Sequence, residues 1–319
     1  MIQVQNVQQQ PSQDVREQLY SQLEDYMGLS STKKKMDSSE KSGGTTLKRK
    51  SSEQSSSSSS SKALSKNTLA IKVNGKTIKG SAQNIVGRVV EAEMGASFRE
   101  EALKAQAVAA YTYIRYNNQK GTIPSLPAKS SVSAKVEDAV EQVIGEALYY
   151  QGEYINATYC ASNAGNSVDS ENVWGGYLPY LRSVESPGDT TLKAYGAVKR
   201  FSEEEIAQYI EDNLDVDPYD YSDPDEWFED EEYINGRYVD SIRVCGRRLS
   251  GREVREELME FALPSVAFEV EYDDGEFIFT TYGYGHGVGM SQQGADYFAQ
   301  RGWDYEEILT HYYTGVTLK

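Results

Sequence analysis

The sequence contains few of the residues from which many enzymes build their active sites. Its 319 residues include two cysteines, Cys160 and Cys245, and two histidines, His286 and His311. The cysteines could form one disulfide, which the sequence leaves open. Together the four residues would fill a tetrahedral zinc site, although none lies at a CxxC or HxxxH spacing. A nucleophilic Cys160–His286 pair is a further alternative, because such partners need only be close in space.

Long apolar runs and an excess of positive charge are also missing. No run of about 18 apolar residues occurs, so the sequence predicts no membrane-spanning helix, and its first residues lack the pattern of a secretory signal. The chain has 32 Lys and Arg against 49 Asp and Glu, a net charge of -17. Because phosphates need Lys and Arg for neutralisation, we expect no nucleic-acid partner.

Two compositional zones divide the chain. Residues 1–66 hold 10 Lys and Arg against 7 Asp and Glu, and residues 55–61 are all serine. Such a segment buries too little apolar surface to offset the entropy of ordering. We therefore predict a disordered tail over residues 1–66, with one short helix near residues 15–29, and one large folded domain over residues 67–319.

The folded zone shows both strand and helix patterns. Alternating apolar residues around Asn74-Gly75 predict a β-hairpin over residues 68–81. Apolar residues at helical spacing predict a helix over 98–117, with a capping box of Ser97 and Glu100. Further segments extend this pattern: helices over 136–143 and 292–301, a hairpin over 148–157, and strands over 238–245, 266–272 and 277–282. The sequence therefore predicts an α+β fold of antiparallel sheets with packed helices.

An acidic segment interrupts the folded zone. Residues 201–236 contain fifteen Asp and Glu and neither Lys nor Arg. A capping box of Ser202 and Glu205 predicts a helix to about Leu214. We interpret the segment as a solvated acidic insertion. A calcium site is the alternative, although the glycine-centred spacing of an EF-hand is missing.

Two short segments are candidates for chemistry. Residues 284–295 place His286 among near-alternate glycines, which lets a ligand or another backbone approach closely. Glu91 and Glu93 precede the predicted helix, and strand-like alternation would put both on one face. Proximity to a helix start favours ionised carboxylates, whereas a general acid requires apolar burial, which Met94 and residues 85–90 could supply. From the residues alone, two interpretations stay open: Glu91 and Glu93 are ordinary carboxylates at a helix start, or they form a catalytic pair.

Read together, four blocks resemble the stage II sporulation protein D family, which also includes the amidase-enhancer domain. They occur in family order and cover roughly residues 68–319. The blocks are VVEAEM (89–94) with EALKAQAVAA (101–110) and TY (112–113); YCASNAGN (159–166) with VWG (173–175), YL (180–181) and VESPG (184–188); LSGREVR (249–255); and GYGHGVGMSQQGA (283–295) with IL (308–309) and HYY (311–313).

This resemblance implies a peptidoglycan lytic transglycosylase of sporulation and engulfment. Such an enzyme cleaves the bond between N-acetylmuramic acid and N-acetylglucosamine in peptide-free glycan strands and leaves 1,6-anhydro-muramic acid ends. The alternative is a non-catalytic, glycan-binding amidase enhancer. The resemblance also implies a location in the cell envelope, a membrane anchor that this sequence does not encode, and partners among cell-wall amidases and engulfment proteins.

The resemblance also implies roles for individual residues. Glu93 matches the catalytic glutamate, and His286 matches a histidine that binds substrate or orients the site. Tyr284, Ser291, Gln292 and Gln293 are the further substrate-binding candidates. We expect no cofactor, with structural zinc as the alternative, because Cys160 stands where the family often has histidine. Gly95 replaces a common proline, and Tyr111 replaces a common arginine.

Overall fold

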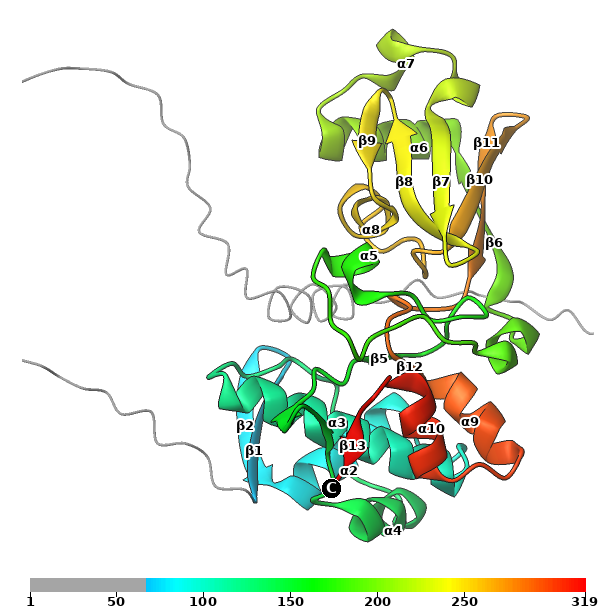
Figure 1. The fold of residues 1–319 in the computed structure, drawn as a ribbon. Helices are drawn as coiled ribbons and strands as arrows, with labels where there is room; N and C mark the ends of the chain where they lie inside the picture. The colour runs from blue at the N-terminus through cyan, green and yellow to red at the C-terminus, as the bar shows by residue number, and fades with distance from the viewer. Residues whose placement is uncertain (1–66) are drawn as a thin grey trace, which may run out of the picture.

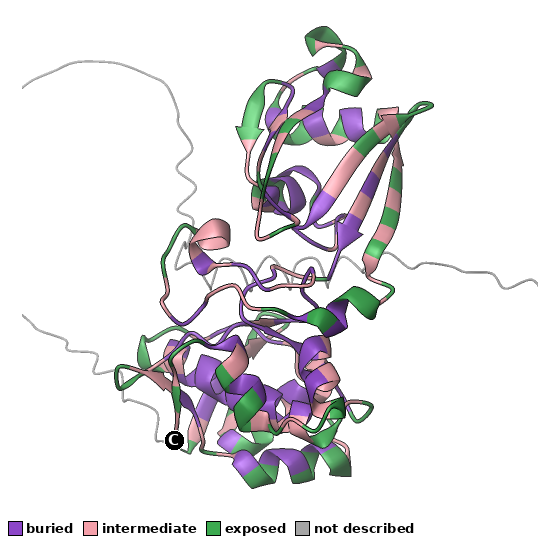
Figure 2. Ribbon diagram, turned by 45° about the vertical axis from the view of Figure 1, so that its right-hand side comes forward, coloured by how far each residue is buried: buried purple, intermediate pink, exposed green. Residues whose placement is uncertain are grey.

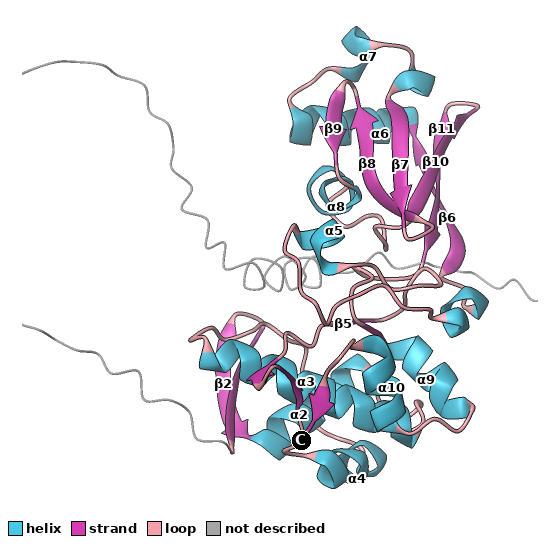
Figure 3. Ribbon diagram, viewed as in Figure 1, coloured by secondary structure: helices cyan, strands magenta, loops and turns pink. Residues whose placement is uncertain are grey.

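The computed structural model describes residues 67–319, which form two lobes joined by a layer of loops (Figure 1). The predicted disordered tail and the short helix near residues 15–29 lie outside the described residues. Most α-helices lie in the lobe that holds the C-terminus, whereas the other lobe is made mainly of strands (Figure 3). Each lobe has its own cluster of buried apolar side chains. The predicted α+β class with antiparallel sheets is confirmed.

The first lobe is built around one long helix, α3 (Glu100–Gln119). Small side chains such as Ala105 and Ala109 are fully buried and let neighbouring helices approach closely. Figure 2 shows this helix buried at the centre of its lobe. Around it lie α2 (Ala82–Glu93), α4 (Ala134–Val143), α9 (Gln292–Gln300) and α10 (Tyr305–Tyr312), the hairpin β1 (Thr68–Val73) and β2 (Lys76–Ser81), and the sheet of β3 (Leu148–Tyr150), β4 (Glu153–Tyr154) and β13 (Thr317–Leu318).

Two sequence interpretations next to Glu93 are wrong. Residues 82–93 form helix α2 instead of a strand, because Ser81 caps the helix and accepts a hydrogen bond from the Asn84 backbone N–H. Glu93 therefore lies at the C-terminal end of a helix. Ser97 does not cap α3 either: the N-cap is Arg99, whose side chain makes no capping bond.

The loop layer between the lobes contains one parallel strand pair. β5 (Tyr159–Cys160) pairs with β12 (Met290–Ser291), which leads directly into α9. The same layer also contains the short helix α5 (Ser170–Trp174) and the 3-10 helix η1 (Pro187–Thr191). This layer brings distant parts of the sequence side by side.

The second lobe packs two antiparallel sheets with helices. Its elements are β6 (Tyr195–Ser202), α6 (Glu203–Leu214), α7 (Pro218–Tyr221), the 3-10 helix η2 (Pro224–Glu226), β7 (Phe228–Ile234), β8 (Tyr238–Val244), β9 (Arg247–Leu249), α8 (Gly251–Glu253), the π-helical turn η3 (Val254–Leu258), β10 (Phe268–Asp273) and β11 (Glu276–Tyr282). The strand orders are β10-β11-β6 and β7-β8-β9. The predicted capping box of Ser202 and Glu205 starts α6.

The acidic segment supplies part of the second core. Ile206 and Ile210 of α6 are fully buried, as is Trp227, and Phe228 is nearly so. Trp227 stacks on Phe277 with 5.4 Å between ring centroids. The segment is therefore acidic on its solvent side and apolar where it meets the sheets. Within residues 67–319, none of the helices combines the length and apolar character needed to cross a membrane.

Candidate active site between the lobes

A cavity lies where the two lobes and the loop layer meet. Its walls come from α2 and α3 of the first lobe, η3 of the second lobe, and the β5, α5 and glycine-rich segments between them. The lining residues are Glu93, Tyr113, Ser125, Leu126, Thr158, Tyr159, Cys160, Ala161, Trp174, Arg255, Glu256, Phe261, Tyr284, His286 and Gln292. Four of the predicted site residues thus meet in one cavity: Glu93, Tyr284, His286 and Gln292.

Glu93 is the last residue of α2, and its carboxyl faces this cavity. Burial raises the pKa of Glu93 to about 7, and a hydrogen bond from Gln292 acts in the opposite direction. In that bond Gln292 Nε2 donates to Glu93 Oε2 over 3.0 Å. Part of the residue's surface still opens into the cavity. A carboxyl of this kind keeps its proton near neutral pH and remains accessible to a ligand, as a general acid requires.

Glu91 does not pair with Glu93. Its carboxylate accepts hydrogen bonds from the backbone N–H and the hydroxyl of Ser133, over 3.1 Å and 2.7 Å. The Ser133 hydroxyl bond is the main reason that the pKa of Glu91 is lowered. The two carboxyls of the same helix therefore have opposite environments. Glu91 is ionised and holds the segment before α4 through Ser133, whereas the Glu93 carboxyl is buried away from water.

The start of α9 positions Gln292 through a buried polar network. Ser291 caps α9 by accepting from the Gly294 backbone N–H, and its hydroxyl donates to Asp189 Oδ1 over 2.8 Å. The other Asp189 oxygen accepts from the Ser186 hydroxyl and from the Asn163 backbone N–H. Ser291 therefore lies behind the cavity wall. Gln293 does not line the cavity either.

His286 is held as a neutral imidazole. Its Nδ1 accepts a hydrogen bond from the Val288 backbone N–H over 3.0 Å, so the ring proton lies on Nε2. Burial, together with the charge of Arg255, lowers the pKa of His286 to about 3. The ring packs against Trp174 with 5.0 Å between centroids. His286 is therefore uncharged, and a hydrogen bond with the Tyr159 backbone also holds its ring.

The glycines around His286 serve the close approach of other protein groups. Gly289 has a φ of +80°, and a Cβ there would lie 2.2 Å from the Thr158 carbonyl oxygen. A Cβ on Gly287 would lie 2.3 Å from the Tyr238 ring. The sequence pattern left open whether a ligand or another backbone comes close at these positions. The structure shows protein neighbours at both.

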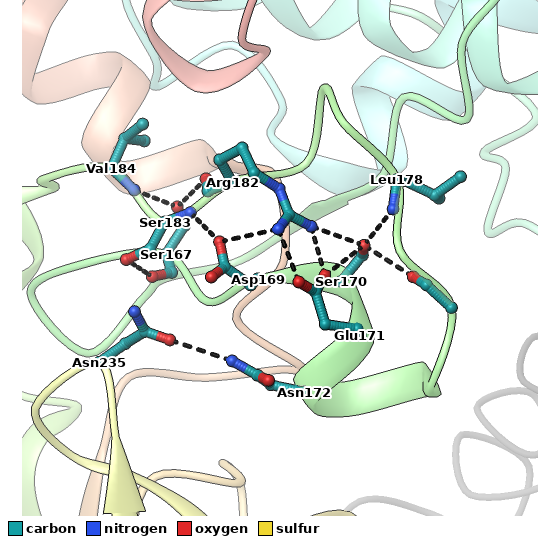
Figure 4. Close-up of polar contacts among 11 residues, drawn as sticks. Ser167, Asp169, Ser170, Glu171, Asn172, Leu178, Arg182, Ser183, Val184 and Asn235 are labelled. Carbon is teal, nitrogen blue, oxygen red and sulfur yellow. Dashed lines mark hydrogen bonds and ion pairs between the residues drawn. The ribbon is translucent and has the colours of Figure 1, made fainter.

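The cavity wall that carries Trp174 is fixed by a polar cluster around Arg182 (Figure 4). The Arg182 guanidinium bonds to both carboxylate oxygens of Glu171 and to the Ser170 hydroxyl. The Ser170 hydroxyl also accepts from the Leu178 backbone N–H, which closes the loop after α5. Asn172 contacts Asn235 of the second lobe. The cluster thereby connects α5 to the rest of the loop layer and to the second lobe.

The cysteines and histidines do not gather into one site. Both cysteines are free and buried, so the disulfide alternative is not realised. Burial raises the pKa of Cys160 to about 12, and its thiol donates to Asn163 Oδ1 over 3.0 Å, which disfavours a thiolate–imidazolium pair. His311 Nε2 bonds to the Glu185 carbonyl. Among residues 67–319, no group of three or more His, Cys, Asp or Glu side chains is arranged to hold a metal ion.

Some cavity residues were not singled out from the sequence. Arg255 and Trp174 were present in the resemblance blocks but received no role there, and Phe261 and Glu256 lay outside them. Arg255 and Glu93 are separated by 161 residues of the sequence. Their proximity depends on how the second lobe returns to the first. No local pattern of residues predicts such a contact.

Comparisons with known proteins identify the family of this chain. The model of the stage II sporulation protein family matches residues 77–152. Stage II sporulation protein D of Bacillus amyloliquefaciens is 32% identical over 274 residues, covering 76% of this chain and 77% of that protein. Its counterpart in Bacillus subtilis is 31% identical over 278 residues with the same coverage. The amidase enhancer of Bacillus subtilis is 28% identical over 290 residues, covering 72% of this chain and 39% of that protein. The chain therefore belongs to the stage II sporulation protein D family.

Proposed function

We propose that this protein is a peptidoglycan lytic transglycosylase that acts in sporulation. It cleaves the bond between N-acetylmuramic acid and N-acetylglucosamine in peptide-free glycan strands and leaves 1,6-anhydro-muramic acid ends. The observation that supports this most directly is the Glu93 carboxyl, whose pKa burial raises to about 7 inside a cavity between the lobes. One carboxyl that is protonated near neutral pH can serve first as an acid and then as a base.

The reaction needs a single carboxyl because the nucleophile belongs to the substrate. Protonated Glu93 gives its proton to the glycosidic oxygen as the bond from that oxygen to muramic acid C1 breaks. The resulting carboxylate then takes the proton of the muramic acid C6 hydroxyl while the C6 oxygen bonds to C1. An intramolecular hydroxyl has a high effective concentration, which replaces the water that a two-carboxylate hydrolase positions.

The other cavity residues have roles that follow from their geometry. Gln292 holds the Glu93 carboxyl in one orientation and stabilises its ionised form after the first proton transfer. His286 orients the site, because its neutral ring packs against Trp174 on the cavity wall. Tyr284 is 42% exposed and Trp174 lines the same wall. Their rings provide faces on which sugar rings can pack.

Product chemistry on purified peptide-free strands tests this proposal. Mass spectrometry of the wild-type products should show anhydro-muramic ends and no reducing muramic ends. Reducing ends would instead show hydrolysis, and Glu256 would become the candidate for a second carboxylate because it lines the same cavity.

We expect the protein to act at the cell envelope on these strands, together with a cell-wall amidase and other engulfment proteins.

The alternative function is a non-catalytic amidase enhancer that grips glycan. It is favoured by the similarity to the Bacillus subtilis amidase enhancer and by Tyr111 at a position where the family commonly has arginine. The two functions differ in one result. Folded protein that binds the strands, leaves them intact and speeds a cell-wall amidase would establish the enhancer.

A further inference from the structure

A second charged group, Arg255, lines the same cavity as Glu93. It lies on the π-helical turn η3 of the second lobe and is 4% exposed. Desolvation lowers the pKa of this guanidinium, yet an arginine side chain keeps its proton in proteins. A buried guanidinium is costly unless an anion balances it. The charges around it therefore indicate what the cavity is built to bind.

Arg255 shares its nearest carboxylate with a second guanidinium. Arg255 Nη1 lies 3.6 Å from Glu256 Oε1, but the other Glu256 oxygen accepts from Arg252 Nε over 2.8 Å. One carboxylate thus faces two guanidinium groups. His286 and Cys160 add no charge, because burial lowers the first pKa and raises the second. With Glu93 protonated, Glu256 is the one carboxylate among the lining residues that faces Arg255, and Arg252 shares it.

The backbone after η3 holds Arg255 in a fixed orientation. Its Nε donates to the Leu263 carbonyl over 3.2 Å, and its guanidinium carbon lies 4.9 Å from the Phe261 ring centroid. Glu260 and Phe261 have φ values of +46° and +63°, in the left-handed region that favours glycine. Backbone strain of this kind is concentrated at functional sites. A fixed guanidinium plane suits a planar, bidentate anion such as a carboxylate.

We propose that Arg255 selects the free lactyl carboxylate of a muramic acid residue bound in the cavity. The inference rests on the proposed glycan substrate, and it names the lactyl carboxylate as the group of that substrate that the protein recognises. Stem peptides are joined to muramic acid through an amide at this same carboxyl, so only a peptide-free residue offers an anion. N-acetylglucosamine offers none at all. Arg255 is thus a specificity-determining residue, and a bound carboxylate would also favour the proton on Glu93.

Two forms of one substrate test the inference. Peptide-free strands are compared with the same strands after their lactyl carboxylates have been converted to primary amides, and kcat/KM for anhydro ends is measured on both. A charge-assisted hydrogen bond to carboxylate predicts a preference of about 10- to 100-fold for the free acid. Arg255→Gln should lose activity on the free acid and lose the preference. Arg243→Gln, which removes an exposed arginine of the same lobe, should keep it.

Equal wild-type rates on the two substrates would overturn the inference, as would a preference that survives Arg255→Gln. If Arg255→Gln fails to fold, the comparison of wild-type kcat/KM on the two substrates still tests the inference. If the wild type produces no anhydro ends from either substrate, the proposed reaction fails separately. In that case the equilibrium affinities for the two strand forms are measured in place of kcat/KM, and equal affinities would overturn the inference.

Discussion

At the scale of single residues, the protonation state of Glu93 determines whether the proposed reaction can start. Because its pKa is raised to about 7, the acid form is lost as pH rises through that value. We therefore expect kcat/KM to fall tenfold per pH unit above about pH 7. A pH–rate profile on peptide-free strands checks this. A plateau extending above pH 9 would mean that another group supplies the proton.

Gln292 should shift that profile in a predictable direction. Its amide donates to the ionised carboxyl and so lowers the pKa of Glu93. Gln292→Ala removes this bond, so the fall in kcat/KM should move to higher pH. Gln293→Ala is the matched control, since Gln293 does not line the cavity. An unchanged profile in Gln292→Ala would show that the bond does not act on the carboxyl in solution.

The same carboxyl should lower stability at neutral pH. An unfolded Glu93 releases its proton near its ordinary pKa of 4.5, whereas the folded form keeps it to about 7. The native state therefore binds more protons between these values, and stability falls as pH rises through them, by up to about 3 kcal/mol. Glu93→Gln removes this penalty. Its Tm should exceed that of the wild type at pH 8 and approach it at pH 4.

At the scale of elements, the glycine-rich turn before α9 depends on close packing. Gly289→Ala would place a Cβ 2.2 Å from the Thr158 carbonyl oxygen at a φ of +80°. Gly302→Ala has a similar φ of +89° but no neighbour within 4 Å. Denaturant unfolding should show a loss of about 1 kcal/mol for Gly302→Ala and of at least about 3 kcal/mol for Gly289→Ala. Equal losses would show that the contact with Thr158 adds nothing.

The elements also show how much the sequence could predict. The apolar stripe of α3 and the Asn74-Gly75 hairpin were confirmed because both signals are local. The segment before Glu93 was misjudged because a short apolar run fits a strand as well as a buried helix. Its burial under α3 and α4 decides for the helix, and that packing is not local. Arg255 was not predicted for the same reason, since the other walls of the cavity that it lines come from the first lobe and the loop layer.

At the scale of the whole molecule, the two lobes make different contributions to the site. The first lobe supplies Glu93, and the second supplies Arg255. The loop layer supplies Trp174, Tyr284 and His286, and Gln292 opens α9. The cysteines are divided in the same way: Cys160 belongs to the loop layer and Cys245 follows β8 in the second lobe. The site therefore depends on both lobes being docked.

This arrangement predicts two thiols and no disulfide. Thiol titration of the denatured, unreduced protein should give two equivalents, because both cysteines are free. In the native state both should react slowly, since burial raises the pKa of Cys160 to about 12 and that of Cys245 to about 11. Fewer than two equivalents after denaturation would contradict the structure.

The most direct test of the central claim compares two glutamates on one helix. Glu93→Gln and Glu91→Gln are assayed with the wild type on peptide-free strands, and anhydro-muramic ends are counted by mass spectrometry. Loss of a general acid predicts a decrease of at least about 100-fold for Glu93→Gln. Glu91→Gln should stay within about threefold of the wild type, since Glu91 bonds to Ser133 outside the cavity. Anhydro ends at the wild-type rate from folded Glu93→Gln would contradict the account.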